Sequence, residues 1–197
     1  VVIEDAAESL GSFYQGGHTG TFGTMGILSF NGNKIITSGG GGAILTNDLE
    51  LAQLAKHLTT TAKVSHRYRY QHDQVGYNYR LPNLNAALGC AQLEQLPKLL
   101  LAKRKLGDKY QQAFADVSEV SLVLEPPECQ SNYWLHAILL DESMANLRDE
   151  VVNFANDSGY EVRPPWDLLS DLQYLDYAPR MKDLRIRAIA DRLINVP

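Results

Sequence analysis

Short, unbroken apolar runs separated by glycine-rich turns dominate the first quarter of the chain. Three such runs occupy residues 1–3, 27–31 and 43–46. Runs of this kind are typical of strands in a sheet that is covered on both faces. Apolar residues then recur at helical spacing, which predicts a helix that Asp48 caps and that continues to about His57. The opening segment therefore predicts strands and a helix of an α/β sheet.

The middle of the chain combines a long polar segment with a long helical one. Residues 59–81 are rich in tyrosine and arginine and show no helical period, so they predict a long, functional loop. Helical spacing then predicts a helix from Leu84 to about Leu96. Pro97 suits the first turn of a second helix, which we expect to continue to about Ala115.

The last third of the chain predicts a small α+β domain. Strand-like apolar runs at residues 120–124 and 133–140 precede a helix at about residues 145–157. Gly159 suits the end of that helix. Residues 160–163 suit a third strand, which the two prolines that follow would end.

Composition excludes several classes of function. The chain is 45% hydrophobic and 21% charged, as in ordinary folded domains, and its net charge of −5 gives no reason to expect nucleic acid or a membrane as partner. No apolar run approaches the roughly 20 residues that span a bilayer. The two cysteines, Cys90 and Cys129, lie far apart, and the histidines lack metal-ligand spacing. We expect a cytoplasmic protein without a metal site.

Lys34 carries the most specific chemical signal in the sequence. It follows an apolar run and precedes the glycines of Gly39–Gly42, and glycines let a ligand approach the backbone closely. Asp5 ends another apolar run, so the two side chains meet if their strands are neighbours. A lysine for a Schiff base and an acid for the pyridinium nitrogen are what pyridoxal phosphate chemistry requires. Each residue alone also suits a surface loop or a turn.

Five short motifs follow one another along the chain, and they surround Lys34 on both sides. They occupy residues 3–11 (IEDAAESLG), 20–23 (GTFG), 29–34 (SFNGNK), 39–42 (GGGG) and 76–80 (GYNYR). In order and spacing they resemble the DegT/DnrJ/StrS family of sugar aminotransferases. The resemblance continues through the small domain, so it covers nearly the whole chain.

The resemblance implies an incomplete fold-type I aminotransferase of the α/β class. The chain would supply the last strands of the large mixed, mostly parallel sheet, followed by a small C-terminal α+β domain. We divide it into residues 1–96, the end of the large domain that binds pyridoxal phosphate, and residues 97–197, a connecting helix and the small domain. Residues 59–81 would form an interface loop of a homodimer.

The resemblance also implies a role for each matching residue. Lys34 would be the Schiff-base lysine and proton shuttle, Asp5 would pair with the pyridinium nitrogen, and Ser29 would bind the cofactor phosphate. Glu8 stands near the cofactor's phenolic oxygen, where the family commonly has glutamine or histidine. Asn78 would cross the dimer interface to the phosphate of the partner's cofactor.

Two arginines are weaker candidates for substrate binding. Arg80 suits an anionic group of the substrate and an acidic residue at the interface equally well. Arg163 lies with Trp166 beside the Pro-Pro turn, where the family approaches its substrate, although a structural role fits it too. The family's usual reaction moves an amino group from glutamate to a keto group of a nucleotide-linked sugar.

Other interpretations of the sequence stay open. The family's chains begin well before residue 1, so we expect the C-terminal part of a longer protein. A truncated, non-catalytic fragment or a regulatory homologue would fold or dimerise without turnover. A dehydratase of the family is disfavoured because those members carry histidine in place of the Schiff-base lysine.

Overall fold

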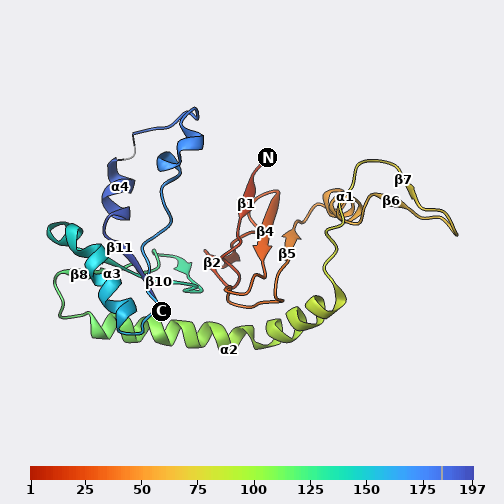
Figure 1. Cartoon of the computed structure of the whole chain (residues 1–197). Coiled ribbons are helices and arrows are strands. Elements are labelled where there is room, and N and C mark those ends of the chain that lie inside the picture. Colours follow the sequence, from red (N-terminus) through yellow and green to blue (C-terminus); the bar gives the residue numbers. More distant parts are fainter. Residues whose placement is uncertain (183) are drawn as a thin grey trace. The chain divides into compact units, whose positions relative to one another are not determined.

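The computed structural model describes residues 1–182 and 184–197, which form two compact units (Figure 1). The first unit contains residues 1–104 and 125–134, and the second contains residues 105–124 and 135–197. The division into domains at residues 96 and 97 stays a prediction, and it falls in the same helix as the boundary between the units.

A three-stranded mixed sheet forms the centre of the first unit. Strand β1 (Ile3–Asp5) lies parallel to β4 (Met25–Ser29), and β5 (Gly42–Leu45) runs antiparallel to β4 on its other side (Figure 1). Asp5 lies opposite Ile27 in this register. The carboxyl ends of β1 and β4 therefore share one edge of the sheet, the edge at which α/β proteins bind ligands. The predicted mixed sheet is confirmed. Strands β1 and β4 each lie two residues away from the predicted ranges 1–3 and 27–31.

Glu4 fastens the Gly20–Gly23 loop to this sheet. Its carboxylate accepts hydrogen bonds from the backbone N–H groups of Gly23 and Gly20, the latter at 2.6 Å. The bond from Gly23 contributes most to holding the pKa of Glu4 below its ordinary value. The same loop packs tightly on β4, because a Cβ on Gly26 would lie 1.9 Å from the carbonyl oxygen of Gly20.

Replacing Glu4 with glutamine is therefore expected to destabilise the fold in a pH-dependent way. A carboxyl whose pKa is depressed by folding stabilises the native state above its unfolded pKa, and this stabilisation is lost as the pH falls through the folded value. Urea unfolding of the wild type and Glu4→Gln should show a gap in unfolding free energy at pH 7 that shrinks below the ordinary pKa of 4.5. An equal gap at pH 7 and pH 3.5 would contradict this account.

Segments far apart in sequence meet in a second small sheet of the first unit. Strands β2 (Phe13–Tyr14) and β3 (Gly17–His18) form a hairpin, and β9 (Cys129–Gln130) pairs with β2. These two-residue strands are too short to give an alternating pattern, so the sequence did not predict them. Their pairing brings residues 129–134 to the loop that follows β1.

The predicted helix after Asp48 is confirmed as α1 (Leu49–Thr59). The Asp48 carboxylate accepts hydrogen bonds from the N–H groups of Glu50 and Leu51 at 2.9 and 3.1 Å. The predicted loop over residues 59–81 contains two short paired strands, β6 (Lys63–Val64) and β7 (Gln71–His72). Within the described residues, no helix is long and apolar enough to cross a bilayer.

The prediction of two helices separated at Pro97 was wrong. The structure has one helix, α2 (Asn83–Ala113), with Pro97 inside it. A proline inside a helix removes one backbone hydrogen bond, at a cost of about 3 kcal/mol. Pro97 lies on an exposed face of the helix, so its ring does not compete with packing on the opposite, half-buried face that includes Leu99 and Leu106.

An antiparallel sheet forms the centre of the second unit, in the order β11-β10-β8. Its strands are β8 (Val120–Leu122), β10 (His136–Leu140) and β11 (Leu193–Val196). A 3-10 turn at Glu142–Leu147 leads into α3 (Arg148–Asp157), and two 3-10 turns at Leu169–Asp171 and Gln173–Leu175 precede α4 (Leu184–Ala190). The buried core of the unit contains Ile138, Leu140, Val162, Ile194 and Val196.

The third strand predicted at residues 160–163 was wrong. Residue Arg163 makes a single bridge to Asn195, and the strand beside β10 is β11. Pro164 and Pro165 have no N–H to donate, which stops the pairing after one bridge. Gly159 does end the preceding helix, with a φ of +86° that suits glycine.

Candidate active site

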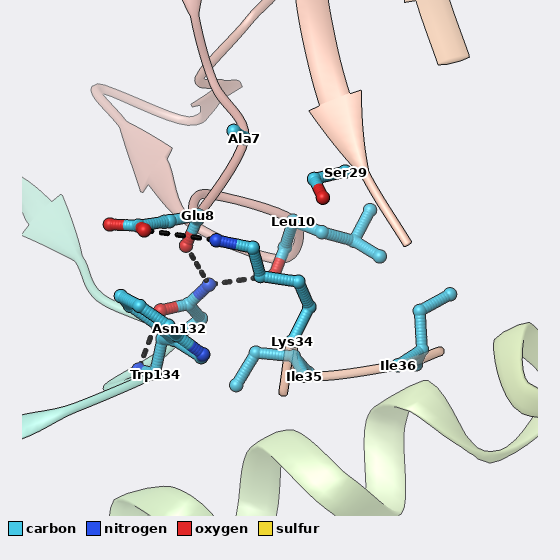
Figure 2. A pocket seen from close by; sticks show the side chains of 9 residues that line it. All are labelled: Ala7, Glu8, Leu10, Ser29, Lys34, Ile35, Ile36, Asn132 and Trp134. Atoms are coloured by element: carbon cyan, nitrogen blue, oxygen red, sulfur yellow. Dashed lines mark hydrogen bonds and ion pairs between the residues drawn. The ribbon is translucent and has the colours of Figure 1, made fainter. Parts of the chain in front are cut away.

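The amine of Lys34 lies between a carboxylate and an aromatic ring. Its Nζ forms an ion pair with Oε1 of Glu8 at 2.9 Å, and it lies 4.3 Å from the centre of the Trp134 ring (Figure 2). The Lys34 side chain is 13% exposed, whereas that of Glu8 is 46% exposed. The loop after β4 thus turns back to place the amine beside the loop after β1.

Asn132 and Trp134 hold these two loops together. Asn132 is buried, and its Nδ2 donates to the carbonyl oxygens of Glu8 at 2.7 Å and Leu10 at 3.0 Å. Its Oδ1 accepts from the backbone N–H of Trp134 at 2.9 Å. Trp134 in turn donates from Nε1 to the carbonyl oxygen of Asn33 at 2.6 Å. Neither residue carries a signal in the sequence that marks it as a site candidate.

Arg104 on α2 anchors the segment that carries Asn132 and Trp134. Its guanidinium donates to both carboxylate oxygens of Glu125, at 2.9 and 2.7 Å, and to the carbonyl oxygen of Ser131 at 2.8 Å. This paired contact holds the pKa of Glu125 below its ordinary value, helped by the N–H of Ser131. Two-pronged arginine–carboxylate contacts fix geometry as well as charge, so the segment has a defined position.

Lys34, Glu8 and Ser29 line one small cavity. Ala7, Leu10, Ile35, Ile36, Asn132 and Trp134 complete its walls (Figure 2). Ser29 is the last residue of β4, and its hydroxyl accepts a hydrogen bond from the N–H of Asn31 at 3.3 Å. The cavity therefore presents an amine, a carboxylate and a hydroxyl at the ends of neighbouring strands.

Asp5 lies at the same edge of the sheet but not in the cavity wall. It is the last residue of β1, its side chain is exposed, and its Oδ1 accepts from the N–H of Ala7 at 3.2 Å. Asp5 and Lys34 were expected to meet if the strands before them are neighbours, and β1 and β4 are neighbours because they pair in parallel.

The structure places Asn78 and Arg80 in a different part of the first unit. Both are exposed, Asn78 makes a bridge to Thr60, and neither lines the Lys34 cavity. Arg80 borders a separate depression of about 870 Å³ between β5, α1 and the start of α2. Tyr77 and Tyr79 stack at 5.3 Å and expose 52% and 74% of their surfaces.

Arg163 belongs to the second unit, where its guanidinium lies 5.0 Å from the centre of the Trp166 ring. Both side chains are exposed. This contact is compatible with either role that the sequence left open for Arg163. Among residues 1–182 and 184–197, no group of three or more histidine, cysteine, aspartate or glutamate side chains could hold a metal.

The mixed α/β sheet thus places Asp5 at the end of β1 and the largely buried Lys34 in the loop after the neighbouring strand β4, at the edge where α/β proteins bind ligands. The chain belongs to the DegT/DnrJ/EryC1/StrS aminotransferase family, whose model matches residues 1–197. This confirms the resemblance found in the sequence. Pyridoxal phosphate, the cofactor expected from the sequence, is the standard cofactor of the family.

Individual relatives agree with this assignment. The chain is 40% identical over 177 residues to EpsN of Bacillus subtilis (strain 168), provisionally described as a pyridoxal phosphate-dependent aminotransferase. The aligned region is 90% of this chain and 45% of EpsN. The chain is also 40% identical over 163 residues to GDP-perosamine synthase of Escherichia coli O157:H7, covering 83% and 43% of the two chains.

Solved structures confirm the fold. Helicobacter pylori PseC, an aminotransferase involved in the biosynthesis of pseudoaminic acid, matches with a TM-score of 0.93 at 23% identity. The match covers 99% of this chain and 53% of PseC. The chain spans about half the length of the curated relatives it matches.

Proposed function

We propose that this chain supplies the catalytic lysine of a pyridoxal-phosphate-dependent aminotransferase that acts on a keto group of a nucleotide-linked sugar, with glutamate as amino donor. The observation that carries the proposal is the position of Lys34. Its side chain is 13% exposed, and its amine lies in a cavity at the shared edge of two parallel strands, with Glu8 and Ser29 in the same wall.

The residues at this edge fit pyridoxal phosphate. The cofactor needs an amine for its aldehyde, an acid for its ring nitrogen and hydrogen-bond donors for its phosphate. Lys34, Asp5 and Ser29 are of these three kinds, and they lie in or directly after neighbouring strands. When bound, the cofactor withdraws electrons from the carbon that bears the migrating amino group.

Each residue has a defined task in this proposal. Lys34 binds the cofactor's aldehyde and moves a proton from its Nζ, and Asp5 keeps the ring nitrogen protonated. Ser29 donates its hydroxyl hydrogen to the phosphate, and Asn78 of the partner subunit of a homodimer donates from its side-chain amide. Its exposure, next to exposed tyrosines, supports a role at an interface. Arg80 and Arg163 are proposed to contact substrate, and the cytoplasmic location stays a prediction.

Trapping the cofactor on the protein tests the proposal directly. The purified protein is incubated with pyridoxal phosphate, reduced with borohydride and digested, and the modified lysine is mapped by mass spectrometry. We expect the adduct on Lys34 and a spectral change when glutamate is added. An adduct on Lys34 without the glutamate response would favour the alternative of a binding-competent, non-catalytic fragment or regulatory homologue. The absence of an adduct on Lys34 would overturn the proposal.

Replacing Glu8 with glutamine is expected to speed attachment of the cofactor to Lys34. The amine must leave its ion pair with Glu8 before it reaches an aldehyde, and partly exposed ion pairs are worth about 0.2–1 kcal/mol. The rate should therefore rise about 1.4- to 5-fold, measured by borohydride quenching at short times. Glu128→Gln is the control, because Glu128 bonds Gln15 instead and does not line the cavity. Slower attachment in Glu8→Gln would show that the carboxylate assists the step.

A further inference from the structure

Trp134 contacts the Lys34 loop at two points. Its indole N–H donates to the carbonyl oxygen of Asn33 at 2.6 Å, and its ring faces the Lys34 ammonium at 4.3 Å from the centroid (Figure 2). An ammonium at this distance from an indole face is attracted by the ring quadrupole. One side chain therefore holds both the backbone that precedes Lys34 and the tip of the lysine itself.

The indole ring has little freedom of its own. Trp134 is 9% exposed, and its backbone N–H is bonded to the buried Asn132. Asn132 bonds the loop that carries Glu8, and Arg104 bonds the neighbouring Ser131. The ring is thus a fixed surface beneath a lysine side chain that is intrinsically flexible along its four-carbon stem.

We propose that Trp134 is a positioning residue for the amine of Lys34, and that it keeps Nζ directed into the cavity before the cofactor arrives. The inference rests on the proposed function, in which Lys34 binds the cofactor. A small displacement of a reacting group lowers reaction rates severely. Removing the Trp134 ring should accordingly slow cofactor attachment to Lys34, although no reacting group is lost.

The contact itself is tested without the cofactor. Reductive methylation with ¹³C-formaldehyde labels lysine amines and keeps their charge, and Lys34→Arg assigns the Lys34 signal. A methyl group over an indole face resonates upfield because of the ring current. We expect this upfield shift in the wild type, its loss in Trp134→Leu, and a smaller shift in Trp134→Phe. Lys63, which lies 4.1 Å from the centre of the Tyr70 ring, and Tyr70→Leu provide the matched control pair.

The functional part is tested by the rate of cofactor attachment, quantified as the borohydride-trapped adduct on Lys34. Trp134→Leu should lower this rate about tenfold, because an amine no longer held against the ring spends less time directed toward the incoming aldehyde. Trp134→Phe keeps an aromatic face and should fall between that variant and the wild type. Tyr70→Leu should match the wild type. Thermal unfolding of each variant shows whether it is still folded at the assay temperature, so that a slower rate can be assigned to lost positioning.

The outcomes of the two experiments are distinct. A Lys34 signal that does not move in Trp134→Leu would overturn the contact. A shift that disappears while the attachment rate stays unchanged would overturn the positioning role. A wild type that shows the shift but forms no adduct would refute the proposed function, and with it the role of Trp134 toward the cofactor, while the contact itself stands.

Discussion

Replacing Lys34 with arginine is expected to abolish amino transfer and the trapped adduct. Arginine keeps a positive charge that can pair with Glu8 and lie over Trp134, so the surroundings of the site need not rearrange. Its guanidinium stays protonated in proteins, however, and it can neither bind an aldehyde nor exchange a proton. Proton transfer by a positioned side chain contributes about 10²- to 10⁴-fold, so we expect a loss of at least about 10²-fold in a single-turnover assay with glutamate.

Lys63→Arg is the matched control for this variant. Lys63 also lies over an aromatic ring, that of Tyr70, but it is exposed and outside the cavity. We expect this variant to retain the activity of the wild type. Substantial turnover in Lys34→Arg, with the cofactor trapped on a different lysine, would remove Lys34 from the mechanism and leave the family resemblance without its catalytic residue.

Local signals in the sequence pointed to Lys34 and Asp5, and the family resemblance added Glu8 and Ser29 as candidates. Asp5, Glu8, Ser29 and Lys34 lie within the first 34 residues, on strand ends and the loops after them. Short apolar runs predict strands whatever their neighbours are, and parallel pairing then brings their ends to one edge. The helix cap at Asp48 was predictable for the same reason, because capping depends on residues two and three positions away.

The contacts that complete the site depend on residues far apart in the chain. Trp134 and Asn132 reach the Lys34 loop because β9 pairs with β2, and two-residue strands leave no periodic signal. The apolar run that begins near Trp134 predicted a strand, which the structure shortens to β10. A tryptophan and an asparagine directly before a buried strand were the one available hint, and their partners could not be named without the fold.

Two errors had a different cause, the competition between local preference and packing. Pro97 favours the start of a helix, yet packing along α2 carries the helix through it. Residues 160–163 have strand-like composition, yet the sheet position beside β10 is taken by β11, whose Ile194 and Val196 are buried. Propensity alone does not decide which of two apolar segments occupies a sheet edge.

Replacing Asp5 with asparagine is expected to separate cofactor attachment from amino transfer. Asparagine can still accept the hydrogen bond from Ala7 N–H that Asp5 accepts at 3.2 Å, so the local turn is retained. It carries no charge, however, and a carboxylate beside a ring nitrogen is what favours its protonated form. The adduct on Lys34 should still form, while amino transfer from glutamate should fall by about 10²-fold or more, the scale of a lost preorganised electrostatic contact.

Asp48→Asn distinguishes this effect from a general loss of aspartate charge. Asp48 caps α1 with its carboxylate and does not line the Lys34 cavity, and asparagine is an equally good cap. We expect wild-type transfer rates in that variant. If Asp5→Asn instead retains the wild-type rate of amino transfer, the carboxylate at the end of β1 does not pair with the ring nitrogen. If it loses the adduct together with the transfer, Asp5 acts in binding rather than in electron withdrawal. Adduct formation and the rate of amino transfer, both measured on Asp5→Asn, thus separate a role of Asp5 in electron withdrawal from a role in cofactor binding.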